Sequence, residues 1–545
     1  MSETTTIGQY LIDRLLALGA RHVFGVPGDF VLAYYKHLTD SELRVVNMAD
    51  EQGAGFAADA YARVNGIGAV CITYGVGSLK VINTTAQAHA EKSPVVVICG
   101  GPGVRERTRE RKLHHKVGTF DSQLKIFREI TVASAILDDA ETAQAEIDRV
   151  LFACLRERLP VYLELPRDMV NATFTVRPVH APKEASDPET LREALEEIAR
   201  MVAGAKKPVI LAGEELHRFE VHDLLPGLLE RSGIPCASTT LSKSVIDEAH
   251  PLYLGVYEGA LGNEHVRDYV ESSDCVLVLG ANLSDVTLGI DTAQLETARM
   301  VHATSDHLNV RRARYERIVF KELILALEPA LGTRPRPTIP NPRRPEPWVA
   351  HADAQITVAR LFQCLNWHLT SETVVITDVG DCFFAATDLF VEHSGFVACA
   401  YYLSLGFSVP GSLGLMMARP HLRPLVITGD GAFQMTGMEL TSILRTGDRL
   451  APIVVILDNE GYGTERPMID GEFNDIHPWR YAEIPAVLGA GKGWVVRTEA
   501  DLDRALAGAE ANLDSYSIID VKIARGDISA GLARLTSHLG KRARA

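Results

Sequence analysis

In the first third of the chain, segments whose apolar residues have helical spacing alternate with short runs of apolar residues. Residues 7–18 carry apolar side chains at the spacing of one helix face, and the short apolar run 22–25 follows. The same alternation continues through strands and helices at residues 45–48, 53–63, 70–73, 78–90, 95–98 and 161–165. Strands that are apolar throughout and alternate with helices are typical of a parallel sheet covered on both faces. The first third is therefore predicted to be a doubly wound α/β domain.

The pattern returns twice more along the chain. Strands are predicted at residues 209–212, 236–237 and 275–280, and again at residues 374–376, 425–428 and 453–457. Two segments, 172–190 and 333–348, are rich in proline and charge and separate these groups as linkers. Because 545 residues exceed what one core usually supports, we predict three α/β domains with doubly wound parallel sheets. Their predicted bounds are 1–180, 190–332 and 351–545, with a proline-rich linker at 333–350.

The most specific stretch, residues 425–463, joins two apolar strands through one predicted crossover helix. The first strand ends at Gly429-Asp430-Gly431, and the second is followed by Asn459 and Gly461. Because adjacent parallel strands end at the same edge of a sheet, we expect Asp430, Asn459 and the Gly461 carbonyl to converge. Such oxygen ligands suit Mg²⁺, and the backbone N–H groups at the helix start suit a diphosphate.

This segment also carries a family resemblance. A GDG at residues 429–431, followed after 26 residues by Asp458-Asn459, resembles the thiamine diphosphate signature, in which a GDG precedes an Asn-Asn pair. The chain departs from the signature at Asp458, which is not a ligand position in the family, so the departure is expected to affect local hydrogen bonding. The resemblance implies thiamine diphosphate and Mg²⁺ as cofactors, with Asp430, Asn459 and Gly461 as metal ligands.

The resemblance assigns further cofactor contacts. Residues 401–410, Y-Y-L-S-L-G-F-S-V-P, match the family segment beside the cofactor rings. There Leu405 is expected to wedge between the rings, and the Leu403 carbonyl to meet the 4′-amino group. The other implied cofactor-binding residues are Asp381, Gly429, Gly431 and Ala432. The resemblance covers nearly the whole chain and implies a pyrimidine-binding, a middle and a diphosphate-binding domain.

Glu51 ends a predicted buried strand and is followed by glycine and alanine rather than by a basic residue. Such a carboxyl is expected to lie in an apolar pocket and to hold a proton near neutral pH. A helix N-cap is the alternative. The motif 51–63, E-Q-G-A-G-F-A-A-D-A-Y-A-R, resembles the pyrimidine-binding domain of thiamine diphosphate decarboxylases. In that family the matching glutamate hydrogen-bonds N1′ of the aminopyrimidine, which implies a catalytic and a cofactor-binding role for Glu51.

Four further side chains are candidates for proton transfer. Asp29 lies in a turn after a strand, where an aspartate is commonly only a cap. His114 and His115, in L-H-H-K-V-G, resemble the paired histidines of pyruvate and indolepyruvate decarboxylases. Glu465 lies in N-E-G-Y-G-T-E, close to a family motif whose glutamate assists decarboxylation and protonation. The hypothesis is that these four residues act together with Glu51.

The resemblance implies non-oxidative decarboxylation of a 2-oxo acid to an aldehyde and CO₂. Pyruvate decarboxylases place the larger residues Tyr and Ile where this chain has Val286 and Thr464. Smaller side chains leave room for a larger substrate, and Phe383 and Phe384 would line the pocket with aromatic surface. We therefore predict as substrate an arylpyruvate, such as phenylpyruvate or indolepyruvate, or a branched-chain 2-oxo acid.

The composition indicates which partners and which compartment are expected for this protein. The net charge of −15 argues against nucleic acid, because phosphate binding needs clustered Lys and Arg. Eight cysteines occur singly, which suggests free thiols in a reducing compartment. No stretch has the apolar length that crosses a membrane, and no targeting segment is recognised, so a cytoplasmic protein is predicted. Because the family builds each site from two chains, the resemblance also implies a homodimer or a dimer-of-dimers homotetramer.

Other functions fit parts of this pattern. An acetohydroxyacid synthase-like carboligase shares the cofactor motifs, but the histidine pair and Glu465 favour aldehyde release. Pyruvate decarboxylase is the alternative that differs in substrate. A dinucleotide-dependent oxidoreductase would need a G-x-G-x-x-G after a strand, which the predicted strands lack. A scaffold that only binds the cofactor is disfavoured, since Glu51, Asp430 and Asn459 are all present.

Overall fold

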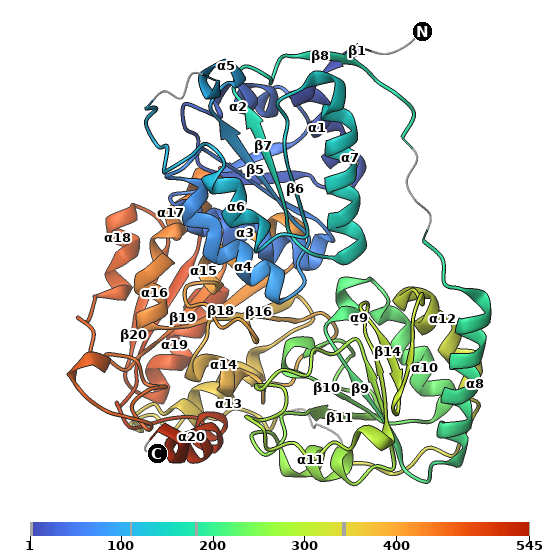
Figure 1. Cartoon of the computed structure of the whole chain (residues 1–545). Helices are drawn as coiled ribbons and strands as arrows, with labels where there is room; N and C mark the ends of the chain where they lie inside the picture. Colours follow the sequence, from blue (N-terminus) through green and yellow to red (C-terminus); the bar gives the residue numbers. More distant parts are fainter. Residues whose placement is uncertain (1–3, 109–111, 180–183, 341–344, 544–545) are drawn as a thin grey trace.

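The computed structural model describes residues 4–108, 112–179, 184–340 and 345–543, with side chains described up to residue 537. Parts of the predicted linkers, residues 180–183 and 341–344, lie outside the described residues. The chain forms three large sheets flanked by helices, coloured blue to teal, green to yellow, and orange to red in Figure 1. This arrangement confirms the predicted α/β class with three doubly wound units.

The first sheet has the strand order β3-β2-β4-β5-β7-β6, and all its strands are parallel. The strands are β2 (His22–Gly25), β3 (Arg44–Asn47), β4 (Gly68–Ile72), β5 (Val95–Gly101), β6 (Ala133–Ile136) and β7 (Val161–Pro166). The helices are α1 (Ile7–Ala17), α2 (Leu32–Thr39), α3 (Glu51–Asn65), α4 (Ile82–Ala90), α5 (Val104–Arg107), α6 (Ser122–Arg128) and α7 (Ala140–Glu157). The predicted strands are all present, and the edge strand β6 is additional.

The last sheet repeats this topology in the order β17-β16-β18-β19-β21-β20, again all parallel. Its strands are β16 (Thr373–Thr377), β17 (Phe396–Ala398), β18 (Arg423–Gly429), β19 (Ile453–Asp458), β20 (Lys492–Val496) and β21 (Ser517–Lys522). The helices include α13 (Val358–His368), α14 (Asp381–Ala386), α15 (Ser408–Ala418), α16 (Asp430–Thr436), α17 (Leu440–Arg445), α18 (Ile484–Leu488), α19 (Glu499–Glu510) and α20 (Ala530–Ala543). Both sheets place their first strand between the second and third, so the two domains share one strand order.

The middle sheet differs from the predicted parallel pattern at one edge. Its order is β11-β10-β9-β12-β13-β14-β15, and its last two strands are antiparallel. The strands are β9 (Pro208–Ala212), β10 (Cys236–Ser238), β11 (Tyr253–Val256), β12 (Cys275–Leu279), β13 (Met300–Ala303), β14 (Leu308–Val310) and β15 (Ala313–Tyr315). The helices around it include α8 (Pro188–Gly204), α9 (Glu215–Arg218), α10 (Leu225–Ser232), α11 (Glu264–Glu271) and α12 (Phe320–Ala330). The links after β13 and β14 are too short for a parallel crossover, so these strands fold back as hairpins.

The crossover between β18 and β19 is not the single helix that was predicted. It is divided into α16, a 3₁₀ turn (Gly437–Glu439) and α17. A side chain at Gly437 would meet the Phe433 ring 2.4 Å away. Glu439, in the turn, accepts hydrogen bonds from the backbone N–H groups of Ala49 (3.1 Å) and Asp50 (2.8 Å). The break therefore ties the crossover to the residues that precede α3.

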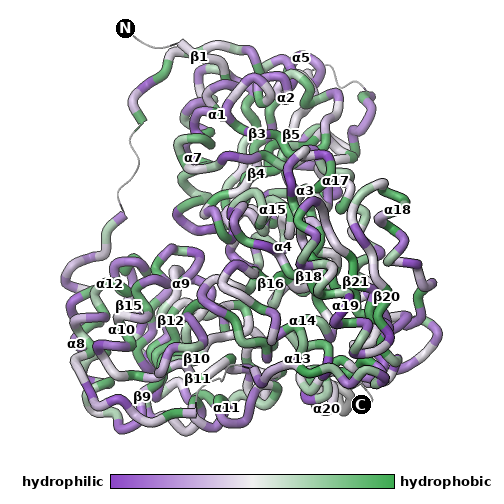
Figure 2. The backbone as a smooth tube through the Cα atoms, turned by 180° about the vertical axis from the view of Figure 1, so that it is seen from behind, coloured by the Kyte–Doolittle hydropathy of each residue, from purple (hydrophilic) through white to green (hydrophobic). Residues whose placement is uncertain are grey.

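The first and last domains pack through α3 and α15. Gly414 on α15 lies against the Ala57 carbonyl of α3, where a Cβ atom would be 2.1 Å from that oxygen. Figure 2 shows hydrophobic segments at α15 and β18, where the two domains meet. Phe56 of α3 and Phe407 belong to one buried cluster, with ring centroids 5.8 Å apart. This shared core fixes the orientation of the first sheet relative to the last.

All eight cysteines are buried with free thiols. Within the described residues, no helix combines the length and the apolarity needed to cross a bilayer. The cytoplasmic location stays a prediction.

Candidate active site

A cavity of about 340 Å³ lies at the carboxyl edge of the last sheet. Its walls come from the segments that follow β16, β17, β18 and β19 and from one residue of α20, Leu535. The predicted site residues that line it are Asp381, Leu403, Leu405, Gly429, Asp430, Gly431, Ala432, Asn459, Gly461, Thr464 and Glu465. The fold thus brings together all the residues of the last domain that were predicted to bind the cofactor or the metal.

Asp430 is the first residue of α16 and only 2 % exposed. Its carboxylate accepts hydrogen bonds from the backbone N–H groups of Gly431 (2.7 Å) and Gly461 (3.1 Å). Burial raises the pKa of this carboxyl to about 7, and the nearby charge of Asp458 acts in the same direction. Asn459 Oδ1 is buried and has no hydrogen-bond partner among the described residues. A buried carboxylate beside an unpaired amide oxygen is a donor set that fits Mg²⁺.

The backbone at this edge is shaped closely around the cavity. At Gly431 a Cβ atom would lie 2.9 Å from the Tyr462 ring, so a larger residue there would displace that ring. Leu403 has a φ of +60°, a left-handed conformation that is uncommon for a leucine. Backbone of this kind is typical of functional sites, where surrounding contacts hold it in place.

Asp378 supplies some of those contacts, although it was not predicted as a site residue. It is buried at the end of β16 and accepts hydrogen bonds from Gly406 N (2.7 Å), Ser408 N (3.1 Å) and Ser408 Oγ (2.7 Å). These bonds anchor the loop that presents Leu403 and Leu405 to the cavity. The sequence signal was an acidic turn after a buried strand.

Asp381 lines the cavity, but its carboxylate is engaged elsewhere. It accepts hydrogen bonds from Ser529, with the backbone N–H at 3.0 Å. Burial raises the pKa of Asp381, and the Ser529 hydrogen bonds oppose that rise. Because Ser529 immediately precedes α20, the contact holds the helix that brings Leu535 to the cavity wall.

A second group of predicted residues meets at the carboxyl edge of the first sheet. His114 Nε2 lies 2.8 Å from Asp29 Oδ2, and the His114 ring stacks on Phe30 with centroids 4.8 Å apart. The His115 ring lies 4.7 Å from that of His114 at 81°, so the two imidazoles face different directions as expected. His115 Nδ1 is buried without a partner among the described residues. None of these side chains lines the cavity around Asp430.

Glu51 does not have the surroundings that the sequence indicated. It begins α3 after the N-cap Asp50, and its side chain is 14 % exposed. Lys80 Nζ lies 2.8 Å from Glu51 Oε2 and also pairs with Asp50. The prediction that Glu51 has no basic partner is therefore wrong, because Lys80 of the same chain pairs with it. Lys80 comes from the turn after β4, and its proximity depends on the parallel crossover rather than on neighbouring sequence.

The substrate-pocket residues are corrected in part. Phe383 is 1 % exposed and packs in the core beneath the sheet, whereas the adjacent Phe384 lines the cavity. Both lie on α14, where successive side chains point about 100° apart and only one of the two faces the cavity. Val286 does not line the cavity either, although Ile290 of the same loop packs against the cluster that includes Leu535. Lining residues that the sequence did not indicate include Tyr462, Met468 and Leu535.

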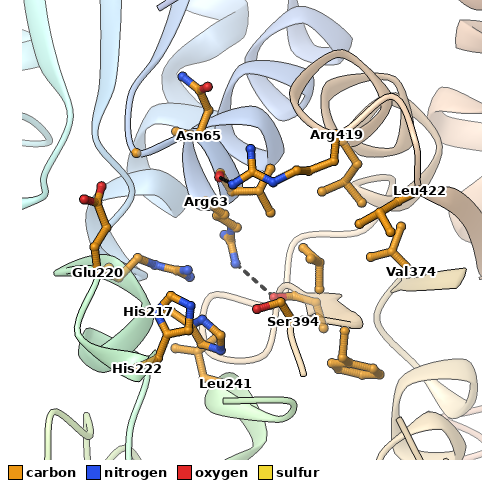
Figure 3. Close-up of a pocket in the computed structure, with 18 of the residues that line it drawn as sticks. Arg63, Asn65, His217, Glu220, His222, Leu241, Val374, Ser394, Arg419 and Leu422 are labelled. Carbon is orange, nitrogen blue, oxygen red and sulfur yellow. Dashed lines mark hydrogen bonds between the residues drawn. The ribbon is translucent and has the colours of Figure 1, made fainter. Parts of the chain in front are cut away.

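A separate cavity of about 400 Å³ lies where the three domains meet (Figure 3). Arg63, His217 and Arg419 face it from three directions. Arg63 Nη1 donates to the Ala398 carbonyl at 2.9 Å and pairs with the buried carboxylates of Asp59 and Glu91. No predicted site residue lines this cavity. The predicted chemistry therefore belongs to the cavity at Asp430 and the group around His114.

Comparison with known proteins shows the family of this chain. The chain matches the thiamine pyrophosphate enzyme family in three parts: an N-terminal TPP binding domain over residues 5–125, a central domain over 195–323, and a C-terminal TPP binding domain over 378–521. It is 35% identical over 536 residues to an indole-3-pyruvate decarboxylase of Azospirillum brasilense, covering 97% of each chain. It is 33% identical over 545 residues to an alpha-keto-acid decarboxylase of Mycolicibacterium paratuberculosis, covering 97% of this chain and 96% of the relative. The chain belongs to the thiamine diphosphate-dependent 2-oxo acid decarboxylase family.

Proposed function

We propose that this protein removes CO₂ from an arylpyruvate or a branched-chain 2-oxo acid and releases the aldehyde, using thiamine diphosphate and Mg²⁺. The observation that carries the cofactor assignment is the buried Asp430 carboxylate beside the unpartnered Asn459 Oδ1. The named activity of the Azospirillum brasilense relative supports an arylpyruvate.

In this proposal the last domain holds the cofactor and the first domain moves protons. Asp430, Asn459 and the Gly461 carbonyl would hold Mg²⁺ and through it the diphosphate. Bound thiamine diphosphate supplies the electron sink that decarboxylation of a 2-oxo acid requires. Glu51 would hydrogen-bond the pyrimidine N1′ and exchange a proton with it. Leu405 would fix the angle between the cofactor rings.

The remaining polar groups would handle the product proton. The hydrogen bond that His114 Nε2 donates to the Asp29 carboxylate orients the imidazole and sets which ring nitrogen carries a proton. His115, set at right angles to His114, offers a second donor. Glu465 lies on the wall of the cofactor cavity and would act on the substrate carboxylate and the product carbon. Proton donors on two sides of the reacting carbon favour release of an aldehyde over transfer to a second 2-oxo acid.

The cavity wall supports a large apolar substrate group. Phe384, Met468 and Leu535 give it apolar surface, and Thr464 leaves space beside them. A volume of about 340 Å³ lies within the usual range of sites for small organic ligands. The aromatic ring of Phe384 is the side chain that we expect to contact the substrate ring.

Release of aldehyde and CO₂ from a panel of 2-oxo acids tests this function. With thiamine diphosphate and Mg²⁺, we expect kcat/KM for phenylpyruvate, indolepyruvate or 4-methyl-2-oxopentanoate to exceed that for pyruvate by roughly tenfold or more. The reason is that a larger apolar substrate group makes more contacts with an apolar pocket. Phe384→Ala should reduce the preference for aromatic substrates while leaving cofactor binding intact. Pyruvate as the best substrate would contradict the specificity, and an acyloin as main product would identify a carboligase.

We also propose that the protein works as a homodimer or a dimer-of-dimers homotetramer. Every residue that lines the Asp430 cavity lies after residue 378, so Glu51 and His114 are absent from it within one chain. A second copy that brings its first domain to this cavity would complete the site.

Mixing two inactive variants tests the shared site. Glu51→Gln and Asp430→Ala chains, denatured together and refolded, should recover about a quarter of wild-type activity, because half of the dimers are mixed and each mixed dimer has one intact site. Each variant refolded alone is the control. If both halves of a site came from one chain, every site in the mixture would carry a substitution and no activity would return.

A further inference from the structure

A buried charged cluster lies directly beside the proposed metal ligands, at the ends of β19 and β21. Asp458, the last residue of β19, is 2 % exposed, and Asp520 on β21 is 1 % exposed. Lys522 Nζ pairs with Asp458 Oδ2 and lies 3.0 Å from Asp520 Oδ2. Asp458 and Lys522 are direct partners in the parallel register of β19 and β21. The cluster therefore holds two carboxylates and one ammonium group at the carboxyl edge of the sheet.

The cluster is connected to the proposed metal site through the backbone. Asp458 is followed in the chain by Asn459, and its strand neighbours β18, where Gly429 pairs with Leu457. Asp430 continues from Gly429. A negative charge at residue 458 therefore lies beside two of the groups that would hold Mg²⁺ and, through it, the diphosphate.

Position 458 is where this chain departs from the thiamine diphosphate signature, which has a neutral asparagine there. An unpaired aspartate would add a full negative charge next to a diphosphate, and a buried carboxylate without a counter-ion destabilises the fold strongly. Within the described residues, Lys522 is the cationic side chain that pairs with Asp458. The aspartate and the lysine thus occur as a matched pair on adjacent strands.

Lys522 is also linked, through Tyr481, to the helix that begins with Asp430. Its Nζ lies 5.9 Å from the centre of the Tyr481 ring. The Tyr481 hydroxyl accepts a hydrogen bond from Gln434 Nε2 of α16 at 3.0 Å. A shift of the Lys522 side chain would therefore affect the position of α16 as well as that of the end of β19.

We propose that Lys522 is a positioning residue for the cofactor site: its ammonium group neutralises Asp458, so that an aspartate occupies the place of the family asparagine without weakening diphosphate binding. This inference rests on the proposed function. It assigns to Lys522 no contact with substrate or cofactor, only control of the charge and position of the segment that carries Asn459.

Charge arithmetic on the cluster gives a sharp test. Counted as formal charges, the two carboxylates and one ammonium group of the wild-type cluster sum to −1. Lys522→Met changes this formal sum to −2, whereas the double variant Asp458→Asn/Lys522→Met restores −1. We expect Lys522→Met to weaken thiamine diphosphate binding at saturating Mg²⁺ by roughly tenfold or more, and the double variant to bind within roughly threefold of wild type. Isothermal titration of the full-length apoprotein with thiamine diphosphate measures both.

The control is Lys492→Met, which removes an exposed lysine from β20 of the same sheet and should change nothing. Thermal unfolding of each apoprotein separates lost folding from lost binding. If Lys522→Met does not fold, a folded, cofactor-binding double variant still supports the proposal. Wild-type-like binding by Lys522→Met overturns it, as does a double variant that binds no better than Lys522→Met or fails to bind. Failure of the wild-type protein to bind thiamine diphosphate would instead refute the proposed function.

Discussion

Replacing Glu51 with glutamine is expected to lower kcat at least about a hundredfold, because an amide keeps the hydrogen-bonding shape but cannot exchange a proton with the cofactor pyrimidine. The loss should appear in kcat rather than in substrate KM, since the carboxyl acts on the cofactor. Steady-state kinetics with saturating thiamine diphosphate and Mg²⁺ measure this loss, and titration calorimetry checks that the variant still binds the cofactor.

Because Glu51 forms an ion pair with Lys80, the test of Glu51→Gln needs a second variant. Glu51→Gln also releases Lys80, so Lys80→Met must be measured beside it. We expect Lys80→Met to retain far more activity than Glu51→Gln, because in the proposed mechanism only the carboxyl exchanges a proton with the pyrimidine. Glu42→Gln, at an exposed site of the same domain, is the matched control. Turnover by Glu51→Gln at the wild-type rate would contradict the assigned role.

Removal of the Asp430 charge is the second substitution with a large expected effect. Asp430→Asn keeps the side-chain volume but takes away the carboxylate that would bind Mg²⁺, so cofactor binding and activity should both fall at least about a hundredfold. Equilibrium dialysis with thiamine diphosphate and Mg²⁺ measures the binding loss. An unchanged cofactor affinity in Asp430→Asn would place the metal elsewhere.

The pKa of Asp430 leads us to predict that Mg²⁺-dependent cofactor affinity varies with pH. Burial raises the pKa of Asp430 to about 7, so a proton competes with the metal below that pH. Because the bound form needs the ionised carboxylate, Mg²⁺-dependent affinity should fall as the pH is lowered from about 8 to about 6 and level off above the pKa. In Asp430→Asn this slope should disappear, which separates Asp430 from other titrating groups. A slope of the opposite sign would exclude control by Asp430.

Much of the fold was predictable because its signals are local. Fully apolar strands such as β5 and β19 show their burial by composition alone, and their alternation with helices indicates parallel sheets. The strand order that the first and last domains share was seen only in the structure. The edge hairpins of the middle sheet were missed because β14 and β15 are short and only partly apolar.

Part of the site was also predictable, because strand order places residues that are distant in the chain at one edge of the sheet. Residues that follow adjacent parallel strands must meet at one edge, so Asp430 and Asn459 were placed together from sequence order alone. Which of two neighbouring side chains faces the cavity was not predictable, as Phe383 and Phe384 show, because the rotation of α14 is set by packing against the sheet.

The sequence by itself determined most of the strands, the parallel character of the first and last sheets and the chemistry at the strand ends, because these depend on residue type and short-range spacing. Only the tertiary structure decided which charges pair. Lys80 meets Glu51 and Lys522 meets Asp458 across 29 and 64 residues of chain. Such pairs depend on strand register and crossover packing, which bring together positions that no local pattern connects.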